Sequence, residues 1–359
     1  MSEPADGLGG EARHPIGYLL DDSRAVALAN KVRERGAEDL GVTRAVIFLT
    51  NACNMSCRYC RSKAHAVPPW HEERLRQFLK ALAAGGTKHI QWTGGEVTLQ
   101  PGFTELVACS TALGMGNSIS TNGTASVEKY LALAQAGVGH FFISLDLLDP
   151  QGFDAVTGTR GLLPKIAGTI EALCRRKENE RFRVVINSVL TKDTAAALLQ
   201  DGGRPLREWL RWCQRLGADD FKFLPASTEL DAFADDAGRR RFLEICAAEV
   251  PARYAFFHYR LERLAAGGHG LRGRARHACY HGLDDRAFDS LGAYPCVIQL
   301  REGGERIYRH DEDAEAQAAG LRRFFETDRL GDPLCRQFCF DVYRDLSDRA
   351  AALLGRPNQ

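Results

Sequence analysis

Three cysteines fall within eight positions of one another in the first sixth of the chain. Cys53, Cys57 and Cys60 have the spacing C-x3-C-x2-C and follow directly after the apolar run 45–49. Three thiols on one short loop are poorly suited to disulfides, because one is always left over, whereas soft metals prefer thiolate ligands. Since the loop offers three ligands, an iron–sulfur cube held here would keep one iron without a protein ligand, open to another molecule.

This spacing, with an aromatic residue (Tyr59) before the last cysteine, resembles the radical S-adenosylmethionine (SAM) enzymes. In that family the open iron binds the amino and carboxylate groups of SAM, and an electron from the cluster cleaves SAM to a 5′-deoxyadenosyl radical. The resemblance implies a [4Fe–4S] cluster, SAM as cofactor, and a reductant such as flavodoxin or ferredoxin.

Gly94, Gly95 and Glu96 resemble the second motif of the same family. There, main-chain carbonyls and the exposed strand edge accept hydrogen bonds from the SAM ammonium, and glycine lets the ligand approach the backbone without a Cβ in the way. Alone, such a tripeptide is only a turn. One helix after the cysteine spacing, it strengthens the resemblance.

Four further polar residues are expected from the resemblance to contact SAM, and each has an ordinary structural alternative. Tyr59 would pack near the adenine, or it is a surface tyrosine. Ser144 and Asn187 would touch the ribose or the carboxylate, or they bond to local backbone as buried polar groups must. Asn122 would contact SAM, or it forms a turn.

A second set of cysteines stands late in the chain. Four thiolates fully coordinate an iron–sulfur cube or a zinc ion. The set consists of Cys279, Cys296, Cys335 and Cys339. We expect the last two to share one face at the start of a helix that runs through Leu353, and residues 297–300 to form a strand before a turn at 302–304. The order resembles the twitch domain, a half-length SPASM domain, which implies one auxiliary [4Fe–4S] cluster; structural zinc is the alternative.

The remaining four cysteines are predicted to lie on helices among apolar neighbours. Free cysteine is commonly a small buried hydrophobe, so core packing is expected for all four, with hydrogen-atom donation to a substrate radical as the alternative. These residues are Cys109, Cys174, Cys213 and Cys246.

Six apolar segments alternate with amphipathic ones, which predicts a parallel sheet wrapped by helices. The strands are expected at 42–49, 89–93, 117–121, 140–146, 182–190 and 220–224. The helices are expected at 21–35, 71–84, 103–113, 127–136, 164–176, 205–216 and 239–250. The fold class predicted is α/β, a partial (β/α)6 TIM-like barrel with a small C-terminal twitch-like domain. The cysteine loop, the 94–96 motif, Asn122 and Asp146 all follow strands, where sites of parallel α/β proteins gather.

Three regions are predicted. Residues 1–40 form an N-terminal extension with one helix, of which 1–20 are loosely ordered; residues 41–255 form the radical SAM core. Residues 256–359 comprise a linker, Gly- and Arg-rich at 265–274, and the twitch-like domain.

Composition excludes some classes of function. The formal net charge of +1 gives no basic field for nucleic acid, and no run approaches the ~18 apolar residues of a membrane span. The first residues lack the features of a secretory signal. Eleven cysteines in such a chain favour a reducing compartment and metal chemistry, and the cytoplasm is the expected location.

The expected activity is hydrogen abstraction from a small polar metabolite, such as a sugar, aminocyclitol or nucleoside, in natural-product biosynthesis. An auxiliary cluster with four protein ligands can accept an electron from the substrate radical, which favours net oxidation, by dehydrogenation or decarboxylation. Crosslinking or epimerisation of a ribosomally made peptide is the alternative. It is placed second because only some 40 residues precede the first strand, too few for a leader-binding domain. The ending 356–359 also lacks the double glycine of the related molybdenum-cofactor enzymes. The alternative from another functional class is a non-enzymatic iron–sulfur or zinc protein that acts as a sensor or binding protein.

Overall fold

The computed structural model describes residues 22–36, 39–62, 67–227, 229, 231–267, 270–271 and 273–356. Residues 1–20, expected to be loosely ordered, lie outside these ranges. The chain divides into two compact units. The flanking unit comprises Met1–Ala52, Arg61–Ser118 and His269–Gln359, and the central unit comprises Cys53–Cys60 and Ile119–Gly268.

The sheet of the flanking unit is built on β1 (Arg44–Thr50), the strand that precedes the cysteine loop. It pairs in parallel with β2 (His89–Gly94) on one side and with β7 (Asp285–Phe288) on the other. Antiparallel β8 (Gly292–Tyr294) and β9 (Tyr308–Arg309) follow β7. Residues 45–49 are all at most 3% exposed, which explains why this strand is continuously apolar instead of alternating.

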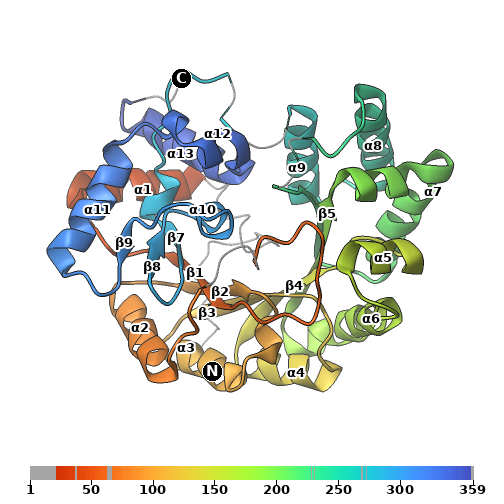
Figure 1. Ribbon diagram of the computed structural model, residues 1–359, viewed down its shortest axis with the longest axis horizontal. Helices are drawn as coiled ribbons and strands as arrows, with labels where there is room; N and C mark the ends of the chain where they lie inside the picture. The colour runs from red at the N-terminus through yellow and green to blue at the C-terminus, as the bar shows by residue number, and fades with distance from the viewer. Residues whose placement is uncertain are drawn as a thin grey trace. The chain divides into compact units, whose positions relative to one another are not determined.

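Helices of the flanking unit come from both ends of its sequence, and α1 packs against α13 (Figure 1). On α2, Leu75, Leu79 and Leu82 recur at helical spacing and are buried. The helices are α1 (Asp22–Arg35), α2 (Glu72–Ala84), α3 (Phe103–Ala112), α10 (Val297–Arg301), α11 (Ala314–Glu326), α12 (Pro333–Phe338) and α13 (Asp341–Leu353). Short 3-10 helices lie at η2 (Val97–Leu99), η3 (His281–Leu283) and η4 (Arg329–Gly331).

The central unit has three parallel strands in the order β4 (Val138–Ser144), β5 (Arg183–Leu190) and β6 (Asp220–Pro225). Its helices are α4 (Val127–Gln135), α5 (Pro150–Thr157), α6 (Leu163–Glu180), α7 (Lys192–Arg215), α8 (Asp236–Glu249) and α9 (Ala255–Ala265). Edge-on aromatic pairs join helices to strands, as Tyr130 of α4 does with Phe141 of β4. The remaining strand, β3 (Gly116–Thr121), runs across the division between the two units.

The predicted α/β class is confirmed, because parallel strands alternate with helices in each unit. In the part of the chain that the structure describes, β6 and β9 are end strands, so the sheet is not closed into a barrel. None of the helices in the described ranges combines the length and apolar character needed to cross a bilayer.

Three element predictions are corrected. Residues 297–300, predicted as a strand, form helix α10, and the hairpin is β7–β8, before Cys296 instead of after it. The helix predicted to run through Leu353 is two helices, because Cys339 has extended ψ and α13 starts afresh. The helix predicted at 205–216 is present as the second part of α7, after a break at the non-helical residues 200–203, but the helical stretch from Lys192 to that break, α5 and α9 were not predicted.

Candidate functional site

The loop Cys53–Cys60 has no regular structure, and helix α5 fixes its backbone. Ser56 N donates to Thr157 O (2.9 Å), and Arg58 N donates to Val156 O (3.0 Å). Both acceptors belong to the last turn of α5, whose carbonyls have no partner within the helix. A helix that the periodicity did not reveal therefore positions the three thiols.

The three thiols of this loop are half-buried. Burial, then Asp146 and the other two thiols, raise the pKa of Cys57 to about 12. Met55 N donates to the Cys53 sulfur at 3.5 Å. Thiols held this close repel one another once ionised, and a metal group that takes up their negative charge and releases their protons removes that repulsion. The donor set therefore fits a thiolate-bound iron–sulfur cluster.

Tyr59 is held by Asp146, a residue whose partner the sequence did not reveal. The Tyr59 hydroxyl donates to Asp146 Oδ2 (2.7 Å), and Val189 N donates to Oδ1 (2.8 Å). Asp146 is 2% exposed, and burial raises its pKa to about 6. Tyr59 is thus neither a free surface residue nor packed by apolar contact alone, since a buried carboxyl group fixes its ring.

Asn122 follows β3 and forms the turn that was one of its two expected roles, while its contact with SAM remains a prediction. Its Oδ1 accepts from Thr124 N (3.1 Å) and from the Thr124 hydroxyl (2.6 Å), which forms the turn. Its Nδ2 donates to Asn54 Oδ1 (2.8 Å) and lies 3.8 Å from the Cys53 sulfur. The turn residue therefore also contacts the cysteine loop.

Ser144 and Asn187 lie side by side in register on β4 and β5, and Lys222 continues the row on β6. Among the described residues, the buried Oδ1 of Asn187 has no hydrogen-bond partner. Lys222 is 6% exposed and was not singled out from the sequence, although a lysine in an apolar strand was a signal for it. This row offers polar groups to a ligand.

Gly94 and Gly95 are required by the chain's own backbone. Gly94 has a φ of +140°, and a Cβ on Gly95 would lie 2.7 Å from the carbonyl carbon of Ala52. The Glu96 carboxylate is buried and accepts from Thr98 N (3.1 Å), capping η2. The backbone of residues 51–52 thus occupies the space beside Gly95 that the motif was expected to leave for a ligand. Contact of this motif with SAM remains a prediction.

The four late cysteines line one cavity in the flanking unit. Cys296 is the N-cap of α10, Cys335 lies in α12, Cys339 ends α12, and Cys279 lies just before η3. The rest of the lining is His281, Pro295, Ile298, Gln299, Phe324 and Tyr343. Three separate segments of sequence thus bring four thiols together.

Electrostatics in this cavity favour a metal group. Burial raises the pKa of the Cys296 thiol to about 12, and burial, then the other thiols, raise the pKa of Cys335 and Cys339 as well. Gln299 Nε2 donates to Asp332 Oδ2 (2.7 Å) and to the Cys335 sulfur (3.4 Å). Thiols in such a site ionise when a cation takes up the charge. In the described ranges no three Cys, His, Asp or Glu side chains gather tightly enough for a single metal ion.

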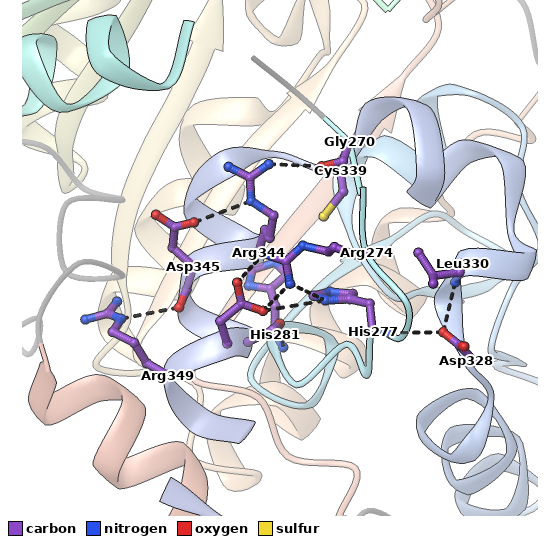
Figure 2. A network of polar contacts seen from close by, with 12 residues as sticks. Gly270, Arg274, His277, His281, Asp328, Leu330, Cys339, Arg344, Asp345 and Arg349 are labelled. Atoms are coloured by element: carbon purple, nitrogen blue, oxygen red, sulfur yellow. Dashed lines mark hydrogen bonds and ion pairs between the residues drawn. The ribbon is translucent and has the colours of Figure 1, made fainter. Parts of the chain in front are cut away.

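Figure 2 shows a polar network among residues that include Cys339 and His281 of the cavity lining. Arg274 makes two bonds to Asp348 (2.7 and 2.5 Å), and Arg344 Nη1 donates to Gly270 O (3.0 Å). Gly270 N donates in turn to Cys339 O (2.8 Å). Gly270 and Arg274 come from the Gly- and Arg-rich segment predicted to be a linker, and these bonds fasten both of them to α12 and α13.

Three of the four other cysteines are buried as expected for core packing: Cys174, Cys213 and Cys246. Cys109, on α3, is half-buried.

Comparisons with known proteins agree with the motifs. Residues 47–190 match the model of the radical SAM superfamily. The chain is 32% identical over 156 residues to a GTP 3′,8-cyclase of Actinobacillus succinogenes (41% of this chain, 45% of the relative). It is 33% identical over 155 residues to a PqqA peptide cyclase of Xanthomonas oryzae (42% and 40%). These matches therefore span less than half of either relative.

Among solved structures, the fold resembles Streptococcus suis SuiB bound to its precursor peptide SuiA. The TM-score is 0.58 at 16% identity, over 90% of this chain and 72% of SuiB. At this identity the likeness concerns the fold, and it extends beyond the 47–190 domain into the C-terminal part of the chain.

The expected substrate and reaction are corrected by these comparisons. A small polar metabolite, such as a sugar, aminocyclitol or nucleoside, undergoing oxidation was expected. The relatives are instead a GTP cyclase and a peptide cyclase, and the structural neighbour binds a precursor peptide. The expectation is therefore wrong. Its source was an argument from the length of chain before the first strand, which says nothing about the surface that binds substrate.

The expected cofactors do agree, since a [4Fe–4S] cluster and SAM are those of the matched superfamily. The family match covers the same stretch of the chain as the cysteine spacing and most of the strand β1 that precedes it. Residues 47–190 are a domain of the radical SAM superfamily.

Proposed function

We propose that this chain is a radical SAM enzyme that forms a crosslink within a ribosomally made peptide. Residues 41–255 are its catalytic core and residues 256–359 its auxiliary-cluster domain. When bound, SAM and the cluster on Cys53, Cys57 and Cys60 supply a 5′-deoxyadenosyl radical that removes a hydrogen atom from the substrate. A peptide substrate is supported by the likeness to a PqqA peptide cyclase and to SuiB.

The observation that carries the reaction type is the cavity lined by four cysteines. Four thiolates saturate a [4Fe–4S] cluster, so no iron there is left for a ligand, and its part is electron transfer. A crosslink removes two hydrogens from the peptide, one as a hydrogen atom and one as a proton and an electron. A second cluster gives that electron a destination. Epimerisation returns its hydrogen and has no electron to dispose of, so the four-cysteine site favours crosslinking.

The chain's own residues orient the reactants. Asp146 accepts a hydrogen bond from the Tyr59 hydroxyl and so fixes the ring of this residue of the cysteine loop. Asn187 presents an acceptor and Lys222 an ammonium group in the same row of strands, which suits the ribose or carboxylate of SAM. A small reductant such as flavodoxin or ferredoxin delivers the electron that starts the reaction.

Anaerobic reconstitution with iron and sulfide tests the proposal. The parent is expected to bind about eight irons, from two four-iron clusters, and to form 5′-deoxyadenosine with dithionite. With a precursor peptide encoded beside its gene, it should yield a product lighter by two hydrogens in mass spectrometry. The Cys53→Ala/Cys57→Ala/Cys60→Ala variant should bind about four irons and cleave no SAM.

Cys109→Ala is the matched control, because Cys109 is a half-buried thiol on a helix outside both cysteine sets. It should keep the iron content and the cleavage of the parent. SAM cleavage by the triple variant would refute the assignment of the loop. Consumption of GTP in place of peptide would refute the substrate class.

A further inference from the structure

His281 is a fully buried side chain that the proposed chemistry does not use. It is 0% exposed and lines the same cavity as the four late cysteines. Within the described part of the chain, neither Nδ1 nor Nε2 has a hydrogen-bond partner. Unpaired polar groups in a protein interior are rare, and each one calls for a physical explanation.

The surroundings hold this ring firmly. It stacks on Tyr343, with ring centres 3.6 Å apart and planes 13° apart, and His281 N donates to the Ser347 hydroxyl (3.1 Å). The nearest carboxylate oxygen, Asp285 Oδ2, lies 4.0 Å from Nε2, beyond hydrogen-bond distance, and Asp285 is paired with Arg44. The imidazole is therefore oriented by stacking and backbone, with no polar partner of its own.

A neutral imidazole carries one N–H and one lone pair, whichever tautomer is present. Leaving that N–H without an acceptor in the protein interior is destabilising. Gln299, another polar group of the lining, already donates to Asp332 and Cys335. Besides Gln299 Oε1 and the Tyr343 hydroxyl, the side-chain acceptors of the lining are the sulfurs of its four cysteines.

We propose that His281 donates a hydrogen bond to a sulfur of the auxiliary cluster and so raises the cluster's reduction potential. A donor to sulfur stabilises the reduced cluster, which carries one more negative charge than the oxidised one. His281 is thus a positioning residue that sets how readily the cluster takes an electron from the substrate. The inference rests on the second cluster of the proposed function.

The test uses the full chain with Cys53→Ala/Cys57→Ala/Cys60→Ala, so that the second cluster is the one observed. His281→Phe keeps the stacked ring but lacks the N–H, whereas His281→Gln retains a donor. By EPR-monitored titration, the Phe variant should be about tenfold harder to reduce, about 59 mV lower for one electron, and the Gln variant should stay near the parent. An unchanged potential in the Phe variant, or equal shifts in both variants, would overturn the inference.

A second measurement does not depend on the Phe variant and covers the case in which that variant fails to fold. With ¹⁵N-labelled histidine, the reduced cluster should show a weak nitrogen hyperfine coupling that the Gln variant lacks. No coupling, or the strong coupling of a directly bound ligand, would contradict a hydrogen bond. Failure of the triple variant to bind about four irons would instead refute the second cluster itself, and thus the proposed function.

Discussion

The two cysteine sites of this chain are built in opposite ways. The loop Cys53–Cys60 presents three half-buried thiols on irregular backbone, fastened by main-chain bonds to the end of α5. The late set places four thiols around a cavity enclosed by side chains from three segments. All seven cysteines are half-buried, so the two sites differ in the number of ligands and in the scaffold that carries them, not in the exposure of the residues. Three ligands on the loop would leave one coordination position of a cluster free, whereas the four of the late set would fill them all.

The largest expected difference between the two sites lies in stability. Cys296→Ala/Cys339→Ala should destroy the four-thiol site, leave its cavity empty and lower the free energy of unfolding by about 5 kcal/mol or more. The three-alanine loop variant should lose a similar amount of iron and little stability, because main-chain bonds to α5 hold the loop whichever side chains it carries. Thermal unfolding of the reconstituted proteins measures both.

A fall of about 10–20 °C in Tm is expected for the cavity variant and a few degrees for the loop variant. Comparable falls would show that the open loop is as much a part of the folded core as the cavity. The iron content of each variant, measured before heating, controls for incomplete reconstitution.

The difference in construction also decides what the sequence reveals. The loop Cys53–Cys60 could be predicted from the sequence because its three cysteines are close together and follow an apolar run. Both β1 and the cysteine motif at its end were therefore predicted. The cavity was predicted by cysteine count, but its scaffold was not. Residues 297–300 are apolar and short, a pattern that fits strand and buried helix equally, and tertiary packing decided for the helix.

Contacts between residues far apart in the sequence were the least predictable feature. Asp146 was noted at a strand end, but no local pattern shows that its carboxylate meets Tyr59, 87 residues away. The same holds for His281, whose role depends on thiols from three segments. Helix α5, which holds the loop, was missed because it is short and begins at a proline after a capping aspartate, a signal that is easily taken for a turn.

The next largest effect is expected at Gly95. A substitution there distinguishes a glycine required by the backbone fold from one required by a ligand. The Cβ in Gly95→Ala would lie 2.7 Å from Ala52 C and 2.8 Å from Asn51 O, both backbone atoms that cannot swing away. We expect a loss of about 4 kcal/mol in urea unfolding. Gly168→Ala is the matched control, since a Cβ there meets nothing within 4 Å inside helix α6, and it should gain up to ~1 kcal/mol.

The two possible origins of this glycine predict different results. If Gly95→Ala unfolds the protein more readily, the backbone of the preceding segment demands the glycine. If the variant is as stable as the parent but binds SAM weakly, the space belongs to the ligand, as the sequence motif implied. Equilibrium binding of SAM to the reconstituted variant, measured beside its unfolding curve, distinguishes the two.

The smallest effect concerns the carboxyl group that holds Tyr59. Burial raises the pKa of Asp146 from 3.8 to about 6, so the folded state favours the protonated form. Its contribution to stability is therefore complete below about pH 4 and is lost as the pH rises to about 6, where it has fallen by about 3 kcal/mol. Asp146→Asn keeps an acceptor for Val189 N and cannot ionise. The difference in unfolding free energy between variant and parent should grow from pH 4 to pH 6 and then stay constant. A difference independent of pH would mean that Asp146 ionises in the folded protein as easily as in water, and that the cysteine loop is as open around Tyr59 as it is around its thiols.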